Sequence, residues 1–202
     1  MSAALFSFAV ASLLIELTPG PNMTYLAILA AARGRAPGLA AVGGVALGLA
    51  LLGLLAVFGL GALVLEQPWL YQSLRWSGVA YLLYLAWEAW SDSRRPIAPL
   101  DPDGNNWRYF RRGLITNLLN PKAALFYITV MPGFLTTTTV RETVLFATAY
   151  VVVATGVHAS VVLLAGSVQP LLTRPERRRV MGGVFAVLLI GIATWVAIGT
   201  AR

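Results

Sequence analysis

Long apolar stretches alternate with short polar segments along the whole chain. An α-helix needs about 20 apolar residues to cross the hydrocarbon core of a bilayer. Six stretches reach that length, at residues 3–32, 39–65, 70–90, 113–135, 143–168 and 180–201. This pattern predicts an all-α integral membrane protein with six transmembrane helices.

Composition favours the same class. Hydrophobic residues make up 58% of the 202 residues and charged residues only 11%, whereas a soluble domain carries about 25% charged residues. The net charge of +7 would indicate nucleic-acid binding if basic residues covered one face of a soluble fold. Here they lie in short segments between apolar stretches, so no nucleic-acid partner is predicted. The absence of cysteine excludes disulfides and thiolate metal sites.

The basic residues are distributed unevenly among the connecting segments. The first, third and fifth segments hold eleven arginines, whereas the second and fourth segments and both tails hold two. Cytoplasmic loops of membrane proteins are enriched in Lys and Arg. We therefore expect the odd-numbered segments in the cytoplasm and both termini outside it. Arg75 and Glu88 lie near span ends, where long side chains reach the interface, and no function is predicted for them.

A weak internal repeat divides the chain in two. Gly20-Pro21 matches Asn120-Pro121, Gln67-Pro68 matches Gln169-Pro170, and Ser77-Gly78-Val79 matches Gly182-Gly183-Val184. The matches occur in the same order, which predicts two inverted three-helix repeats at 1–92 and 113–202, joined by a cytoplasmic linker loop at 93–112. Inverted repeats with interrupted helices are typical of secondary transporters, whose binding site lies near the membrane midplane.

Prolines predict a break in the first and fourth helices. In Thr18-Pro19-Gly20-Pro21-Asn22, two prolines cannot continue a helix, and a broken span is tolerated only beside protein or a water-filled cavity. Pro21 suits the first turn of a new half-helix, and Asn120 before Pro121 suits an N-cap. The positive ends of both half-helices could then converge on a substrate carboxylate. The alternative is that these prolines are packing kinks without a ligand.

Three ionisable residues inside the spans are candidates for chemistry. An intramembrane carboxylate such as Glu16 is costly and points to function; burial favours its neutral form, so it is a candidate proton carrier. Lys122, the sole lysine in the sequence, is predicted to face an anion, either a substrate carboxylate or Glu16 as a structural partner. His158 is either a hydrogen-bonded core residue or a proton relay. Asn117 and Asn120 share a helix face and are candidate substrate ligands.

Other patterns narrow the function less. Gly44-x-x-x-Gly48 predicts a close helix contact, either within one chain or between the subunits of a homodimer. The sequence has no Walker, G-x-S-x-G or H-E-x-x-H motif, so neither ATP-driven transport nor hydrolytic catalysis is expected. No cofactor is predicted.

Several of these segments resemble the lysine exporter superfamily (LysE/RhtB type). They are Leu17-Thr18-Pro19-Gly20-Pro21-Asn22, Gly38-Leu39, residues 75–82, residues 110–114 and residues 117–123. The resemblance covers essentially the whole chain. It implies a bacterial inner-membrane exporter of amino acids, driven by the proton gradient. The implied substrate site consists of Pro19, Gly20, Pro21, Asn22, Asn117, Asn120, Pro121 and Lys122. Glu16 departs from the apolar residue expected at its position, which favours a cationic or polar substrate.

Together these observations predict a secondary exporter of amino acids, with Glu16 and His158 in proton coupling and no resident metal. One rival is a divalent-cation exporter of the same architecture, which needs clustered carboxylates or histidines. A second is a membrane enzyme or assembly subunit, which would need a polar catalytic cluster.

Overall fold

The computed structural model describes residues 2–18, 20–58, 67–94, 106–137, 139–167 and 175–199, and every element within these ranges is helical. The first half comprises α1 (Ser2–Leu17), α2 (Pro21–Arg33), α3 (Arg35–Val57) and α5 (Pro68–Arg94). The second half comprises α6 (Asn106–Leu118), α7 (Pro121–Leu125), a π-helix η1 (Phe126–Val130), a 3₁₀ helix η2 (Met131–Phe134), α8 (Val140–Gly166) and α9 (Pro175–Gly199).

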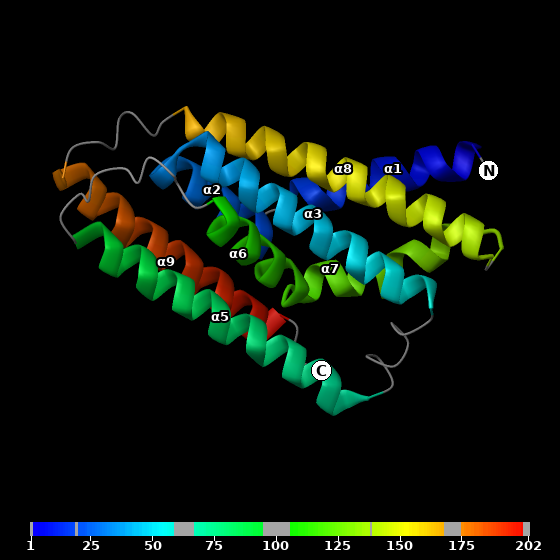
Figure 1. The fold of residues 1–202 in the computed structure, drawn as a ribbon. Helices are drawn as coiled ribbons and strands as arrows, with labels where there is room; N and C mark the ends of the chain where they lie inside the picture. Colours follow the sequence, from blue (N-terminus) through cyan, green and yellow to red (C-terminus); the bar gives the residue numbers. More distant parts are fainter. Residues whose placement is uncertain are drawn as a thin grey trace.

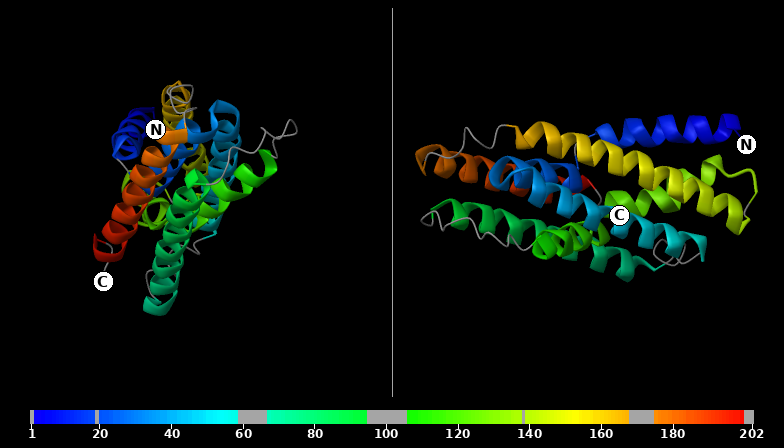
Figure 2. Two further views of the ribbon diagram at one scale, coloured as in Figure 1. Left: turned by 90° about the vertical axis from the view of Figure 1, so that its left-hand side faces the viewer. Right: turned by 45° about the horizontal axis from the view of Figure 1, so that its top comes forward.

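The helices form an elongated bundle centred on α3 (Figures 1 and 2). Helix α3 packs against α6 and α8, and α2 and α1 also pack against α8. Helices α5 and α9 pair with each other along one side of the bundle and contact the remainder mainly through α2. The partners within α3–α8 and within α5–α9 run in opposite directions (Figure 1), as inverted repeats require. The repeat relation itself remains a prediction.

The outer surface of the bundle is apolar. Among the described residues, α3 and α8 are long and apolar enough to span a membrane, and α1 with α2 would form a third, bent span. Large exposed apolar side chains point outward from α1, α5, α8 and α9, including Phe6, Trp87, Leu164 and Val187. So many large exposed apolar side chains are suited to contact with lipid. The six-span topology remains a prediction for the other helices.

Helix ends that border the odd-numbered connecting segments share one end of the bundle. The end of α2, the start of α3, the end of α5 and the start of α9 all lie toward the left of Figure 1. Gly34 alone joins α2 to α3, at φ 92°, a conformation that glycine adopts without the strain of a Cβ. This arrangement agrees with one common side for the arginine-rich segments; the side of the membrane stays a prediction.

Both predicted helix breaks are present. Helix α2 starts at Pro21 with extended Gly20 as its N-cap, and α1 and α2 are bent by 59°. Helix α7 starts at Pro121, and the side chain of its N-cap, Asn120, accepts a hydrogen bond from the backbone N–H of Lys122 at 3.0 Å. Proline fits these first positions because its missing N–H would have no intrahelical partner there.

The predicted linker is shorter than expected. Helix α5 continues to Arg94 and α6 begins at Asn106, so both ends of the predicted loop at 93–112 are helical; residues 95–105 lie outside the described part of the chain. Trp107, Phe110 and Leu114 recur at helical spacing, with arginines at other positions of the turn. This amphipathic pattern extends α6 toward its N-terminus.

Helices α3 and α6 touch through their backbones. A Cβ added to Gly44 would lie 1.9 Å from the carbonyl oxygen of Phe110, and one added to Gly113 would lie 2.1 Å from that of Ala41. A Cβ at Gly48 would lie 2.7 Å from the side-chain oxygen of Asn117. The Gly44-x-x-x-Gly48 motif is therefore used within one chain, which resolves the alternative left open by the sequence.

Arg75 and Glu88 connect helices and do not simply extend to the interface. The Arg75 guanidinium is buried and donates to Gln72 on its own helix and to the carbonyl of Ala197 on α9. Glu88 Oε1 accepts from Arg108 at 2.8 Å and from Arg112 at 2.5 Å, which joins α5 to α6. Arg75 therefore links α5 to α9, and Glu88 links α5 to α6.

Candidate functional site at the helix breaks

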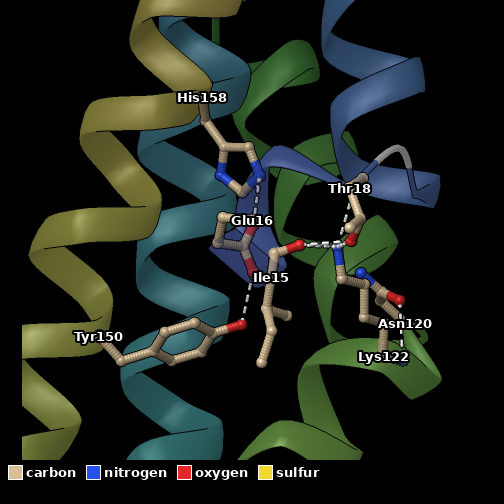
Figure 3. A network of polar contacts seen from close by, with 7 residues as sticks. All are labelled: Ile15, Glu16, Thr18, Asn120, Lys122, Tyr150 and His158. Atoms are coloured by element: carbon tan, nitrogen blue, oxygen red, sulfur yellow. Dashed lines mark hydrogen bonds and ion pairs between the residues drawn. The ribbon is translucent and has the colours of Figure 1, made fainter. Parts of the chain in front are cut away.

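The two helix breaks meet at the side chain of Lys122. A Cβ built on Gly20, the N-cap of α2, would lie 3.3 Å from Cδ and 3.6 Å from Nζ of Lys122. Lys122 itself stands in the first turn of α7. The start of α2, the start of α7 and the end of α1 therefore share one small region (Figure 3).

The ammonium group of Lys122 contacts the end of α1 and not a carboxylate. Nζ donates to the carbonyl oxygens of Ile15 at 2.7 Å and Thr18 at 2.9 Å, and to Thr18 Oγ1 at 3.0 Å. The last carbonyls of a helix have no intrahelical partner and carry the negative end of the helix dipole. A direct ion pair of Lys122 with Glu16, one of the two predicted alternatives, is not formed.

Glu16 pairs with two residues of α8 (Figure 3). Its Oε2 lies 3.2 Å from Nε2 of His158, and its Oε1 accepts a hydrogen bond from the Tyr150 hydroxyl at 2.7 Å. All three side chains are buried, with Glu16 at 6% and His158 at 1% exposure. Both carboxylate oxygens are therefore engaged, and the predicted proton-coupling residues Glu16 and His158 lie in direct contact.

An aromatic group fixes the position of Tyr150. Its ring stacks on Phe126 at a centroid distance of 3.7 Å, and the ring of Tyr127 meets it edge-on at 5.1 Å. Phe126 and Tyr127 begin the π-helix η1, and π-helical turns occur frequently at functional sites. This packing leaves the Tyr150 hydroxyl little freedom except toward Glu16.

The predicted asparagines occupy different surroundings. Asn120 caps α7. Asn117 is fully buried against Gly48 of α3, and neither its Oδ1 nor its Nδ2 has a hydrogen-bond partner among the described residues. Asn22 is buried in the first turn of α2, and its Oδ1 is likewise unpartnered. Unpaired buried amides are costly, so these two side chains have hydrogen-bonding capacity to offer a ligand or water.

The remaining predicted site residues define helix starts. Pro21 and Pro121 are the first residues of α2 and α7, and Pro19 lies outside the described residues. The sequence analysis did not predict three groups of this site. They are the Tyr150 hydroxyl, which binds Glu16, and the oxygens of Thr18 and Ile15 that accept from Lys122. The position of Tyr150 two turns before His158 on the same helix was the available signal. The backbone carbonyl of Ile15 could not be recognised from residue type, and only the predicted end of its helix pointed to it.

A metal-binding cluster is not found in this region. Within the described ranges no group of three or more His, Cys, Asp or Glu side chains gathers at one point. Glu16 and His158 are instead committed to each other. The geometry therefore offers no support for the divalent-cation rival.

Comparison with known proteins identifies the family. The family of LysE type translocators matches the chain over residues 13–200. The chain belongs to this family. This agrees with the resemblance in the sequence motifs and places the helix breaks within a translocator.

The relatives include proteins with assigned efflux roles. A leucine efflux protein of Salmonella choleraesuis is 30% identical over 202 residues, covering 95% of this chain and 93% of the relative. The uncharacterized membrane protein YahN of Escherichia coli is 36% identical over 186 residues, covering 85% and 82%. A homoserine/homoserine lactone efflux protein of Salmonella typhimurium is 28% identical over 131 residues, covering 64% of each chain. No solved structure matches the chain significantly.

Proposed function

We propose that this LysE-type translocator is a secondary active exporter of amino acids or close derivatives, coupled to inward proton movement. It would reside in the bacterial inner membrane with both termini in the periplasm. The observation that carries the proposal is the meeting of the α1 and α2 ends at the Lys122 ammonium. The relatives named for leucine and homoserine efflux support the substrate class.

The substrate carboxylate would bind at the start of α2. The first N–H groups of a helix lack intrahelical partners and carry partial positive charge, and Lys122 adds a full positive charge beside Gly20. Asn22 lies in that first turn with an unpartnered buried Oδ1. Asn117 and Asn120 would hydrogen-bond the substrate or position the α7 start that carries Lys122.

The proton would be carried by the Glu16–His158 pair. A buried carboxylate such as Glu16 could also bind the amino group of the substrate. Its two oxygens are already used by His158 and Tyr150, which favours the proton role. With one proton on the pair, opposite charges face each other across the contact between α1 and α8 and strengthen it, whereas loss of that proton removes the positive charge and weakens the contact. Proton and substrate could then bias opposite conformations of the bundle.

Counterflow in proteoliposomes tests this proposal. Purified protein is assayed with labelled amino acids, leucine first and then the other nineteen, under an imposed pH gradient. We expect saturable exchange of a subset and acceleration by the gradient. Flat uptake for all twenty would contradict the exporter assignment.

A substitution at Glu16 tests the proton-coupling step separately. Glu16→Gln should abolish pH-driven exchange while substrate binding remains measurable, because a side-chain amide neither gains nor loses a net proton near neutral pH. Glu176→Gln, the same change on an exposed residue at the start of α9, serves as the control and should behave as the native protein does. Normal exchange in Glu16→Gln would reduce Glu16 to a structural role.

A further inference from the structure

The Lys122 ammonium occupies a complete binding site for a –NH₃⁺ group. Such a group has three N–H donors and no acceptor. Three oxygens surround Nζ at hydrogen-bond distance, namely the carbonyls of Ile15 and Thr18 and the hydroxyl of Thr18. The hydroxyl donates its own proton to the Ile15 carbonyl, so its oxygen is free to accept from the ammonium.

These three oxygens do not depend on Lys122 for their arrangement. They lie at the C-terminal end of α1, where the backbone N–H of Thr18, the residue after the helix, donates to the Ile15 carbonyl at 3.1 Å. Lys122 reaches them from α7 through a flexible four-carbon stem. Thr18 is exposed, so these oxygens are not enclosed within the bundle.

The usual alternative for an amino group is already occupied. A substrate ammonium would ordinarily seek a carboxylate, and Glu16 lies one residue from Ile15. Both Glu16 oxygens, however, are held by Tyr150 and His158 in a buried position. The oxygens at the end of α1 are therefore the acceptors that an incoming ammonium can use without first breaking that pair.

We propose that the Ile15 and Thr18 oxygens form the ammonium subsite of the transporter, and that the side chain of Lys122 occupies this subsite until an amino acid binds. This inference rests on the proposed function. The substrate ammonium replaces the lysine ammonium on the three oxygens. The displaced Lys122 turns about its stem toward the substrate carboxylate at the start of α2, where Gly20 already lies beside it.

The exchange has a consequence for specificity. The subsite selects a group with three N–H donors, so a primary ammonium fits it and a quaternary ammonium of equal charge does not. When no substrate is present, the positive charge of Lys122 and the partial negative charge at the end of α1 compensate each other.

Chemical rescue tests the subsite directly. Lys122→Ala empties the three oxygens, and millimolar methylammonium should then raise the melting temperature of the purified variant by about 2–4 °C through binding to the folded state. Tetramethylammonium, which has no N–H donor, should give no rise. The native protein should not respond to methylammonium because its own lysine fills the site, and Thr18→Val combined with Lys122→Ala should respond weakly.

The outcomes separate clearly. No rise in Lys122→Ala, or an equal rise with tetramethylammonium or in the native protein, overturns the subsite. Because rescue is measured without transport, it can succeed even where amino-acid counterflow fails, and a failed rescue leaves the exporter assignment standing on its own assay.

A second measurement applies if Lys122→Ala does not fold. Lys122 is the sole lysine in the chain, so an amine-acylating reagent followed by mass spectrometry reports on it specifically. Thr18→Val removes one of the three oxygens and should increase the acylation rate of Lys122 several-fold, with the N-terminal amine as internal reference. An unchanged rate would mean that these oxygens do not hold the ammonium, and the proposal would fall.

Discussion

The backbone contact between α3 and α6 allows a sharp test of how the site is held. At Gly44 a methyl group would lie 1.9 Å from the carbonyl oxygen of Phe110 and 2.8 Å from the backbone nitrogen of Leu114. At the neighbouring Gly43 the nearest atoms belong to the Phe110 ring, at 3.6 and 3.7 Å, which is ordinary contact. Gly44→Ala therefore forces the helices apart, whereas Gly43→Ala fits.

The expected magnitude follows from these distances. A carbon atom normally meets a carbonyl oxygen at about 3.3 Å, so α6 must move by about 1.4 Å to accept Gly44→Ala. Overpacking of this kind costs about 1–3 kcal/mol, occasionally more. Alanine also stabilises a helix interior over glycine by about 0.8–1 kcal/mol, and both variants share this gain. We expect the free energy of unfolding of Gly43→Ala to equal or exceed that of the native protein. It should exceed that of Gly44→Ala by about 2 kcal/mol or more.

Thermal unfolding of the purified protein in detergent measures the difference. Two kcal/mol corresponds to a gap in melting temperature of about 4–8 °C for a chain of this size. Transport should fall further in Gly44→Ala than its stability loss explains, because Asn117 and the α7 start lie on the displaced side of the interface. Equal melting temperatures for the two variants would refute the backbone contact.

Two further changes probe the break and the α5–α6 link. Asn120→Ala removes the N-cap bond to the Lys122 N–H and should lower the free energy of unfolding by about 1 kcal/mol. Asn120→Asp keeps an acceptor and should stay near the native melting temperature. Equal falls in melting temperature for the two variants would contradict a capping role. Glu88→Gln removes the charge that Arg112 and Arg108 share, so amide hydrogen exchange in the last turns of α5 should accelerate. Arg108→Gln, at an arginine whose side chain is 56% exposed, should have a smaller effect because exposed pairs contribute about 0–1 kcal/mol; identical exchange in all three proteins would argue against the link.

The parts of the fold that sequence could predict are those fixed by local chemistry. Pro21 and Pro121 start new helices because of what proline does to its own turn, and no knowledge of neighbours is needed. The Gly44-x-x-x-Gly48 motif predicts a close approach but does not name its partner, because Gly113 is brought opposite it by the path of the whole chain. The helical ends of the linker were missed for a related reason, since the prolines in the loop outweighed the amphipathic pattern that starts α6.

The candidate site likewise has a part that local chemistry predicts and a part that depends on how the helices pack. Glu16, His158 and Lys122 were identifiable from the sequence because ionisable groups are costly inside an apolar span. Their pairing was not, because it depends on which helix faces α1 at that depth. Sequence reasoning offered Lys122 as a partner of Glu16, and the structure instead gives Glu16 to α8 and Lys122 to the α1 carbonyls. Tyr150 was hidden because a tyrosine in an apolar helix is ordinarily a core residue.

A short break between two helices creates a site with both signs of charge. The end of α1 presents carbonyl oxygens with partial negative charge. The start of α2, which follows after three intervening residues, presents N–H groups with partial positive charge. A zwitterionic amino acid carries an ammonium and a carboxylate on one carbon atom, so it matches two helix ends that lie this close together. An unbroken helix would separate those ends by its full length, and two unrelated helices would have to be brought together by packing. Here three intervening residues keep the two ends close in the chain, and the Lys122 ammonium from the second half of the chain contacts the carbonyl end of α1.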